Sequence, residues 1–235
     1  MKIAIMQPYF FPYVGYYSLI KYSERFILFD TPQFIYHGWI ERNRILKPIE
    51  GWQYVKVPLI KHSRSSVIKD VFIKKNEQWQ EKIIAQLQHY KKQAPFFKST
   101  MQIIEQIKYM DFNNIVDLNI KILELTCSYL NIDCNFSVFS RMNSVIEDVK
   151  EPDEWALNIS KAIGANEYVN PPGGQEFFNK NKYEKNNIKL TFLKNRLNPY
   201  NQHRTTFEAG LSIIDVMMFN SPNEISKIIN DYELI

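Results

Sequence analysis

The chain has 235 residues, a formal net charge of +4 and 45 % hydrophobic residues, which is the composition of a globular protein with one large or two small domains. Its basic residues are scattered, so we expect no nucleic-acid partner. Cys127 and Cys134, the two cysteines, have no metal-ligand spacing, which excludes a disulfide scaffold and a structural zinc site. No apolar run reaches the length of a membrane span, so we expect a cytoplasmic protein without one.

The first seventeen residues, MKIAIMQPYFFPYVGYY, predict a strand, a stiff loop and the start of a helix. Residues 1–6 are apolar and favour a strand. Pro8 and Pro12 forbid a helix and keep the following backbone extended, and Gly15 closes the loop. Parallel α/β sheets bind ligands outside the carboxyl ends of their strands, so this aromatic loop is our first candidate site.

A second strand is expected at 25–30, and it ends in Asp30. This carboxylate is either a working residue of the site or the cap of a turn, and the pattern leaves both readings open. Residues 33–48 then mix aromatic and basic side chains without a clear period. Arg42 and Arg44 could hold a phosphate or carboxylate and Trp39 could stack on a ring, although a solvated ribbon with Trp39 in the core has the same composition.

The rest of the chain alternates strand and helix patterns. The loop at 170–174 contains Gly173 and Gly174, whose exposed amides could meet an anion. Ser212 and Asp215 share a helix face, and we interpret them as an N-cap and a solvated acid. Further strands are expected at 52–58, 67–73, 135–139, 167–169 and 188–193, and helices at 77–90, 101–107, 115–130, 155–163, 211–219 and 222–232.

These elements predict a single α/β domain over residues 1–235, Rossmann-like, with a mostly parallel sheet and a helical insertion near 77–130. The Walker, GxGxxG, HExxH and GxSxG motifs are absent. Tyr13-Val14-Gly15-Tyr16 has the spacing of the H-x-G-H motif that follows the first strand of many nucleotidylyltransferases. A nucleotidylyltransferase-like sheet is therefore one possible form of the predicted fold. Tyrosine, however, carries no positive charge at neutral pH, which argues against adenylyl transfer itself.

Several blocks along nearly the whole chain match one known family pattern. They are IAIMQPYFFPYVGYY at 3–17, Asp30 with Gln33, WIERNRI at 39–45, Trp52 with Val57-Pro58, Ala165-Asn166-Glu167-Tyr168, NPYNQ at 198–202 and LSIIDVMMFN at 211–220. With these blocks the chain resembles the WbqC-like family of bacterial proteins. It departs from the family pattern at 170–174, where the family tends to have a Ser-Gly type of turn.

The resemblance implies a setting in O-antigen and other surface-glycan biosynthesis, which includes lipopolysaccharide. It implies a transferase that modifies a nucleotide-linked amino sugar, with N-acyl or aminoacyl transfer to the sugar amine as the expected chemistry. The donor would be acyl-CoA, an acyl carrier, which would then be a partner protein, or an aminoacyl donor, and we expect no metal. A nucleotidylyl- or adenylate-forming enzyme using the Tyr13–Tyr16 loop, and a non-catalytic glycan-assembly partner, remain as alternatives.

Acyl transfer to an amine needs a base for the ammonium proton and donors for the developing oxyanion. On this interpretation His37 or Asp30 is the base, and Gln7, Asn43 and the Gly173 and Gly174 amides lie near the oxyanion. The other residues expected to bind substrate are Tyr9, Tyr13, Tyr16, Gln33, Trp39, Arg42, Arg44, Tyr200 and Gln202.

Overall fold

The computed structural model describes residues 1–75 and 77–235. Its central element is a six-stranded sheet. Five strands run parallel, and the edge strand β8 runs antiparallel to β7. The predicted α/β, Rossmann-like class with a mostly parallel sheet is confirmed. In spatial order the strands are β5 (Phe136–Val138), β2 (Arg25–Leu28), β1 (Lys2–Met6), β6 (Glu167–Asn170), β7 (Lys189–Asn195) and β8 (Tyr232–Leu234).

Strand β1 is covered on both faces, as its apolar sequence requires. Ile3 and Ile5 point into one hydrophobic core, and Ala4 and Met6 point into the other. Helices on both faces supply these cores, and α1, α7 and α8 pack on the larger one, whereas α5 and α6 pack on the smaller. Their bounds are α1 (Val14–Tyr22), α5 (Glu154–Ala162), α6 (Lys180–Glu184), α7 (Ile213–Phe219) and α8 (Pro222–Asn230).

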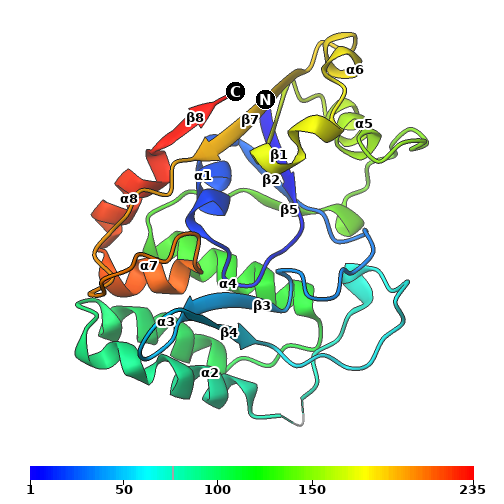
Figure 1. Cartoon of the computed structure of the whole chain (residues 1–235). Helices are drawn as coiled ribbons and strands as arrows, with labels where there is room; N and C mark the ends of the chain where they lie inside the picture. The colour runs from blue at the N-terminus through cyan, green and yellow to red at the C-terminus, as the bar shows by residue number, and fades with distance from the viewer. Residues whose placement is uncertain (76) are drawn as a thin grey trace.

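The long connection between β2 and β5 carries an antiparallel hairpin and a group of helices. In Figure 1 this group lies beyond the carboxyl ends of the parallel strands, below the sheet. The helices expected at 77–130 are present. The group consists of β3 (Arg42–Leu46), β4 (Trp52–Lys56), α2 (Trp79–Leu87), α3 (Phe97–Lys108), α4 (Ile115–Tyr129) and the 3₁₀ helix η2 (Gln88–Lys92).

One expectation about local structure is wrong. Residues 67–73 do not form a strand, because their centre is the 3₁₀ helix η1 (Ile68–Asp70), with isolated bridges on either side. Residues 33–48, whose sequence shows no clear period, contain β3. Two more 3₁₀ helices are η3 (Phe139–Arg141) and η4 (Pro172–Phe177).

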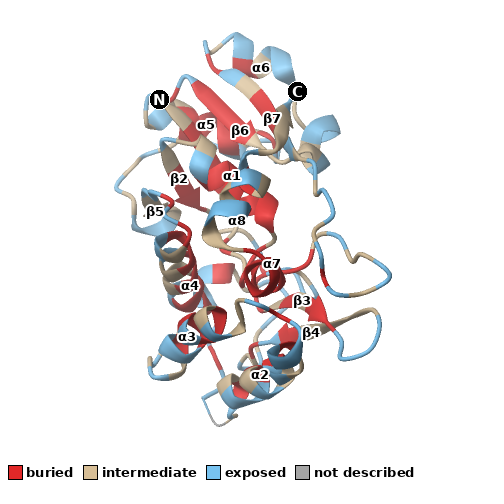
Figure 2. Ribbon diagram, turned by 90° about the vertical axis from the view of Figure 1, so that its left-hand side faces the viewer, coloured by how far each residue is buried: buried red, intermediate tan, exposed pale blue. Residues whose placement is uncertain are grey.

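Helix α7 is buried along its whole length and is red throughout in Figure 2. It lies against α8, α3 and β3, so it joins the sheet to the hairpin and helices beyond it. A short helix that is apolar nearly all round is stable only in such an interior position. Within the described residues, no helix has both the length and the apolar character needed to cross a bilayer.

Candidate functional site

The opening loop, residues 7–12, follows β1 and is held by side chains from distant elements. Asn43 of β3 donates from Nδ2 to the carbonyl oxygens of Phe10, at 3.0 Å, and Phe11, at 2.8 Å. Phe11 has a φ of 40°, in the left-handed region that bulky side chains rarely adopt. Asn43 is buried, so its bonds hold this unfavourable backbone without competition from water.

Two further side chains complete the support of the loop. Asn119 of α4 donates to the carbonyl oxygens of Pro8, at 2.8 Å, and Ile40, at 2.9 Å. Ser212 donates to the carbonyl oxygen of Phe11 at 2.8 Å and also caps α7, which confirms its predicted role as an N-cap. The opening loop is therefore held in place by the β3–β4 hairpin, by α4 and by the N-cap of α7.

The ring of Tyr13 packs directly over Gly15. A Cβ at position 15 would lie 2.5 Å from the nearest ring atom, so any side chain here would force the Tyr13 ring out of its present place. Burial raises the pKa of Tyr13, and burial together with the Tyr13 phenol raises the pKa of Tyr9. Both hydroxyls therefore stay protonated at neutral pH and can donate hydrogen bonds.

A pocket of about 390 Å³ opens beside the loop. It lies outside the carboxyl ends of β1 and β6, which are neighbours in the sheet although β2 follows β1 in the chain. Parallel sheets bind ligands at such a switch point. We name it the tyrosine–arginine pocket, and its lining residues are Met6, Tyr9, Pro12, Tyr13, Trp39, Asn43, Arg44, Pro171, Leu197 and Gly210.

Arg44 brings a positive charge to this pocket. Its guanidinium lies over two indole rings, 5.4 Å from the centroid of Trp39 and 5.2 Å from that of Trp52. Nη2 donates to the carbonyl oxygen of Gly210 at 3.2 Å, and Nε is buried with no hydrogen-bond partner among the described residues. A planar cation held in this way is suited to a phosphate or carboxylate.

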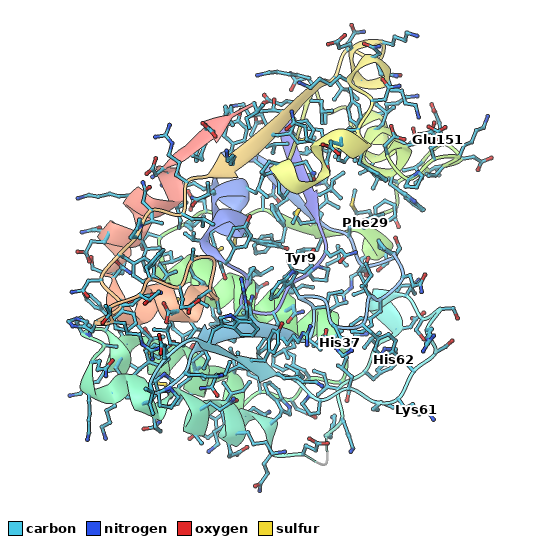
Figure 3. The ribbon with its side chains drawn as sticks, in the orientation of Figure 1. Tyr9, Phe29, His37, Lys61, His62 and Glu151 are labelled. Carbon is cyan, nitrogen blue, oxygen red and sulfur yellow. The ribbon has the colours of Figure 1, made fainter. Side chains whose placement is uncertain are left out.

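Five of the predicted site residues therefore meet in one pocket: Tyr9, Tyr13, Trp39, Asn43 and Arg44. Figure 3 shows Tyr9 between the end of the first strand and the hairpin below it. The amide group of Asn43 is already bonded to the loop and to the backbone N–H of Arg44, so Asn43 positions the lining rather than offering a free donor.

Asp30 is buried and does not line the tyrosine–arginine pocket. Its carboxylate accepts from the backbone N–H of Ser140 at 3.0 Å and from the Ser140 hydroxyl at 2.5 Å. Of its two readings, this geometry matches the turn cap, because the carboxylate ties the end of β2 to the segment after β5.

His37 and Arg42 contact each other outside the pocket lining. His37 is exposed, with a φ of 65°, and Figure 3 shows it near the start of β3. Arg42 donates to the His37 carbonyl oxygen, and its guanidinium lies 4.1 Å from the centroid of Tyr54. Arg42 and Arg44 are two residues apart in β3 and so point to the same face of the strand, but Arg42 lies over Tyr54 and is not part of the pocket lining.

Three other predicted residues have contacts that leave them outside the pocket. Tyr16 is fully buried, and its hydroxyl donates to the carbonyl oxygen of Gln7 at 2.9 Å. The Gln7 side chain is half-buried and is not part of the lining. Gln33 is exposed and donates to the carbonyl oxygen of Arg64 at 2.6 Å.

Gly173 and Gly174 lie in η4, just after the pocket residue Pro171. Neither lines the pocket. A Cβ at Gly174 would lie 3.1 Å from Nδ2 of Asn170, so this glycine allows η4 to pack close to the end of β6.

Tyr200 and Gln202 belong to a second, buried network centred on Asp215. The Asp215 carboxylate accepts from the hydroxyls of Tyr90 and Tyr200, each at 2.6 Å, and from Nε2 of Gln202 at 2.9 Å. Burial raises the pKa of Asp215 to about 6, against the opposing effect of these donors. The expectation of a solvated acid at 215 is wrong, because this residue is fully buried.

Sequence reasoning missed several lining residues that carry little chemistry of their own. Met6 is the last residue of β1, and Pro171 directly follows β6. Their position at the carboxyl ends of parallel strands is the sequence signal that could have predicted them. Leu197 and Gly210 come from the segment after β7, and no local pattern indicates their place in the pocket.

The fold and the pocket define a Rossmann-like α/β protein with an aromatic, singly cationic ligand site at its switch point. Comparison with family models matches residues 7–227 to the WbqC-like protein family, and the chain belongs to that family. It is 27 % identical over 223 residues to the uncharacterized protein Rv1507c of Mycobacterium tuberculosis, covering 93 % of each chain. No solved structure matches the chain.

Proposed function

We propose that this protein is a transferase that binds a nucleotide-linked sugar in the tyrosine–arginine pocket and modifies the sugar for surface-glycan synthesis. The observation that carries the proposal is Arg44, whose guanidinium lies over two indole rings at the switch point of the sheet. Its guanidinium would pair with the diphosphate, and Trp39 would stack on the base or the sugar.

The size and chemistry of the pocket support such a ligand. Its volume of about 390 Å³ falls within the usual range for small-molecule sites. No carboxylate is among the residues that line it, so nothing in the lining repels a phosphate. The neutral phenols of Tyr9 and Tyr13 would donate to sugar or phosphate oxygens.

The proposed reaction is acyl or aminoacyl transfer to a sugar amine. The amine nitrogen forms a bond to the acyl carbonyl carbon, the bond to the donor's leaving group breaks, and a base removes the amine proton. His37 is the better of the two candidate bases, because its ring is exposed whereas both carboxylate oxygens of Asp30 are bonded to Ser140. The Tyr13 hydroxyl is the donor in the lining that we assign to the oxyanion.

The test combines binding and turnover on purified protein. Isothermal titration calorimetry with UDP- and dTDP-linked amino sugars should detect a ligand, and the matching sugars without the nucleotide should bind far more weakly. Incubation with acyl-CoA donors should then add the mass of one acyl group to the sugar. Binding of no nucleotide-linked sugar would overturn the proposal.

A second candidate is a binding protein without turnover. The observation in its favour is that the lining contains no carboxylate, imidazole or thiol that could act as a base. A binding protein would bind the nucleotide-linked sugar tightly and give no acyl product with any donor. His37→Ala would then keep its full function in glycan assembly. Nucleotidylyl transfer is not proposed, because Tyr16, which takes the place of the second histidine in the H-x-G-H spacing, is fully buried.

A further inference from the structure

A short ribbon far from the tyrosine–arginine pocket presents apolar side chains to solvent. Leu59 bridges Ile73, and the backbone N–H of Ile60 donates to the carbonyl oxygen of Phe72 at 2.9 Å, so the two segments run antiparallel. Ile73 is buried beneath the ribbon. Because side chains alternate along such a pair, Ile60 and Phe72 share the opposite, outward face.

Ile60 and Phe72 are large apolar side chains that remain about half exposed on the same face of the ribbon. They are 51 % and 48 % exposed, and they lie next to each other across the ribbon. An apolar pair of this kind costs free energy in water unless a partner covers it, so contiguous exposed apolar surface often marks an interaction site.

Basic side chains surround this pair. A groove of about 840 Å³ runs along the ribbon, and three of its lining residues are lysines, whereas none is acidic. Figure 3 shows Lys61 and His62 at the outer end of this loop, well away from Tyr9. We name it the lysine groove, and its lining residues are Leu59, Ile60, Lys61, Phe72, Ile73, Lys74, Lys75 and Asn113.

Two of the groove lysines form ion pairs with nearby carboxylates, but these pairs are exposed to solvent. Lys74 pairs with Glu77 at 3.0 Å and Lys75 with Asp111 at 2.7 Å, and all four side chains are at least one-third exposed. Exposed pairs of this kind contribute little net stability, so a partner's carboxylates can compete for these lysines. Lys61 makes no ion pair with any residue that the structure describes.

We propose that the lysine groove docks an acidic, amphipathic helix of a partner protein. The apolar side chains of the helix would cover Ile60 and Phe72, and its carboxylates would meet Lys61 and the neighbouring lysines. A protein helix fits better than a lipid surface, because the apolar pair lies in a groove rather than on a protruding tip. This inference does not depend on what the tyrosine–arginine pocket binds.

The test uses a fluorescein-labelled peptide of about 20 residues, long enough to form a helix, with leucines along one face and glutamates on the others. A second peptide carries lysine in place of every glutamate. Fluorescence anisotropy against the full-length protein should detect binding of the acidic peptide alone, and added salt should weaken it.

Three variants separate the groove from general charge. Phe72→Ala and Lys61→Glu should each raise the Kd of the acidic peptide roughly tenfold. Lys98→Glu, a matched charge reversal at an exposed position near the start of α3, should leave it unchanged. Thermal melts confirm that each variant is folded, and because Lys61 and Phe72 are exposed, we expect no loss of stability.

Any of three results would overturn the inference. The Lys61→Glu and Lys98→Glu variants could weaken binding equally, or the basic peptide could bind as tightly as the acidic one. Alternatively, phosphatidylglycerol vesicles could bind in a manner that depends on Phe72 and Lys61 while the acidic peptide does not bind, which would make this face a membrane contact.

Discussion

Replacement of Asn43 by alanine should destabilise the protein through the opening loop. The variant loses both donor bonds to the loop, and the Phe10 carbonyl oxygen is then left without a partner among the described residues. An unsatisfied buried carbonyl costs about 1–3 kcal/mol, and the lost bond to Phe11, which keeps its bond to Ser212, costs about 1 kcal/mol more. We therefore expect the two lost donor bonds alone to lower the free energy of unfolding by about 3 kcal/mol, before the bond from the Arg44 backbone N–H is counted.

Urea denaturation followed by circular dichroism measures this loss, and the melting temperature should fall by roughly 6–12 °C. Asn43→Asp keeps the side-chain size but removes the donors, so it should be destabilised at least as much. Asn223→Ala is the matched control, because Asn223 is exposed on α8 and its side chain makes no hydrogen bond to a described residue. A change of less than about 1 kcal/mol for Asn43→Ala would refute the proposed support of the loop.

Three further predictions concern single side chains. The pKa of Asp215 is raised from 3.8 to about 6, so the folded state holds the carboxyl proton more tightly than the unfolded state does. The protonated carboxyl therefore stabilises the fold by about 3 kcal/mol. This stabilisation is fully present below pH 3.8 and is lost as the pH rises through 6. Urea titrations between pH 4 and 7 should show this fall in wild type but not in Asp215→Asn. Gly15→Ala should displace the Tyr13 ring and weaken ligand binding in calorimetry as much as Tyr13→Ala does, with little change in melting temperature. Asp30→Asn should lower the free energy of unfolding by about 2 kcal/mol in urea, through its bonds to Ser140, and leave ligand affinity unchanged.

The place of the site could be predicted from local sequence. Strand β1 followed by a loop with two prolines points to a ligand site at a carboxyl edge, and the structure has a pocket there. The crowding of aromatic and basic residues in a short segment indicates Trp39 and Arg44 as site residues, and both line that pocket.

Other features depend on contacts that no local pattern contains. Strand β3 was not recognised because its inward position is occupied by the polar Asn43, which breaks the usual alternation. Tyr9 and Tyr16 look equivalent in sequence, yet the phase of α1 turns Tyr16 into the core. Asp215 was mistaken for a surface acid because one of its partners, Tyr90, is 125 residues away.

We propose that Arg44 holds the anionic part of a nucleotide-linked sugar. The most direct measurement is calorimetric titration of UDP- and dTDP-linked amino sugars into wild type, Arg44→Gln and Arg42→Gln, with melting temperatures to confirm folding. Arg44→Gln should lose roughly ten- to a hundredfold in affinity, because a charge-assisted hydrogen bond is removed. Arg42→Gln should bind like wild type, since Arg42 lies outside the pocket. Equal affinity of Arg44→Gln and wild type would contradict the claim.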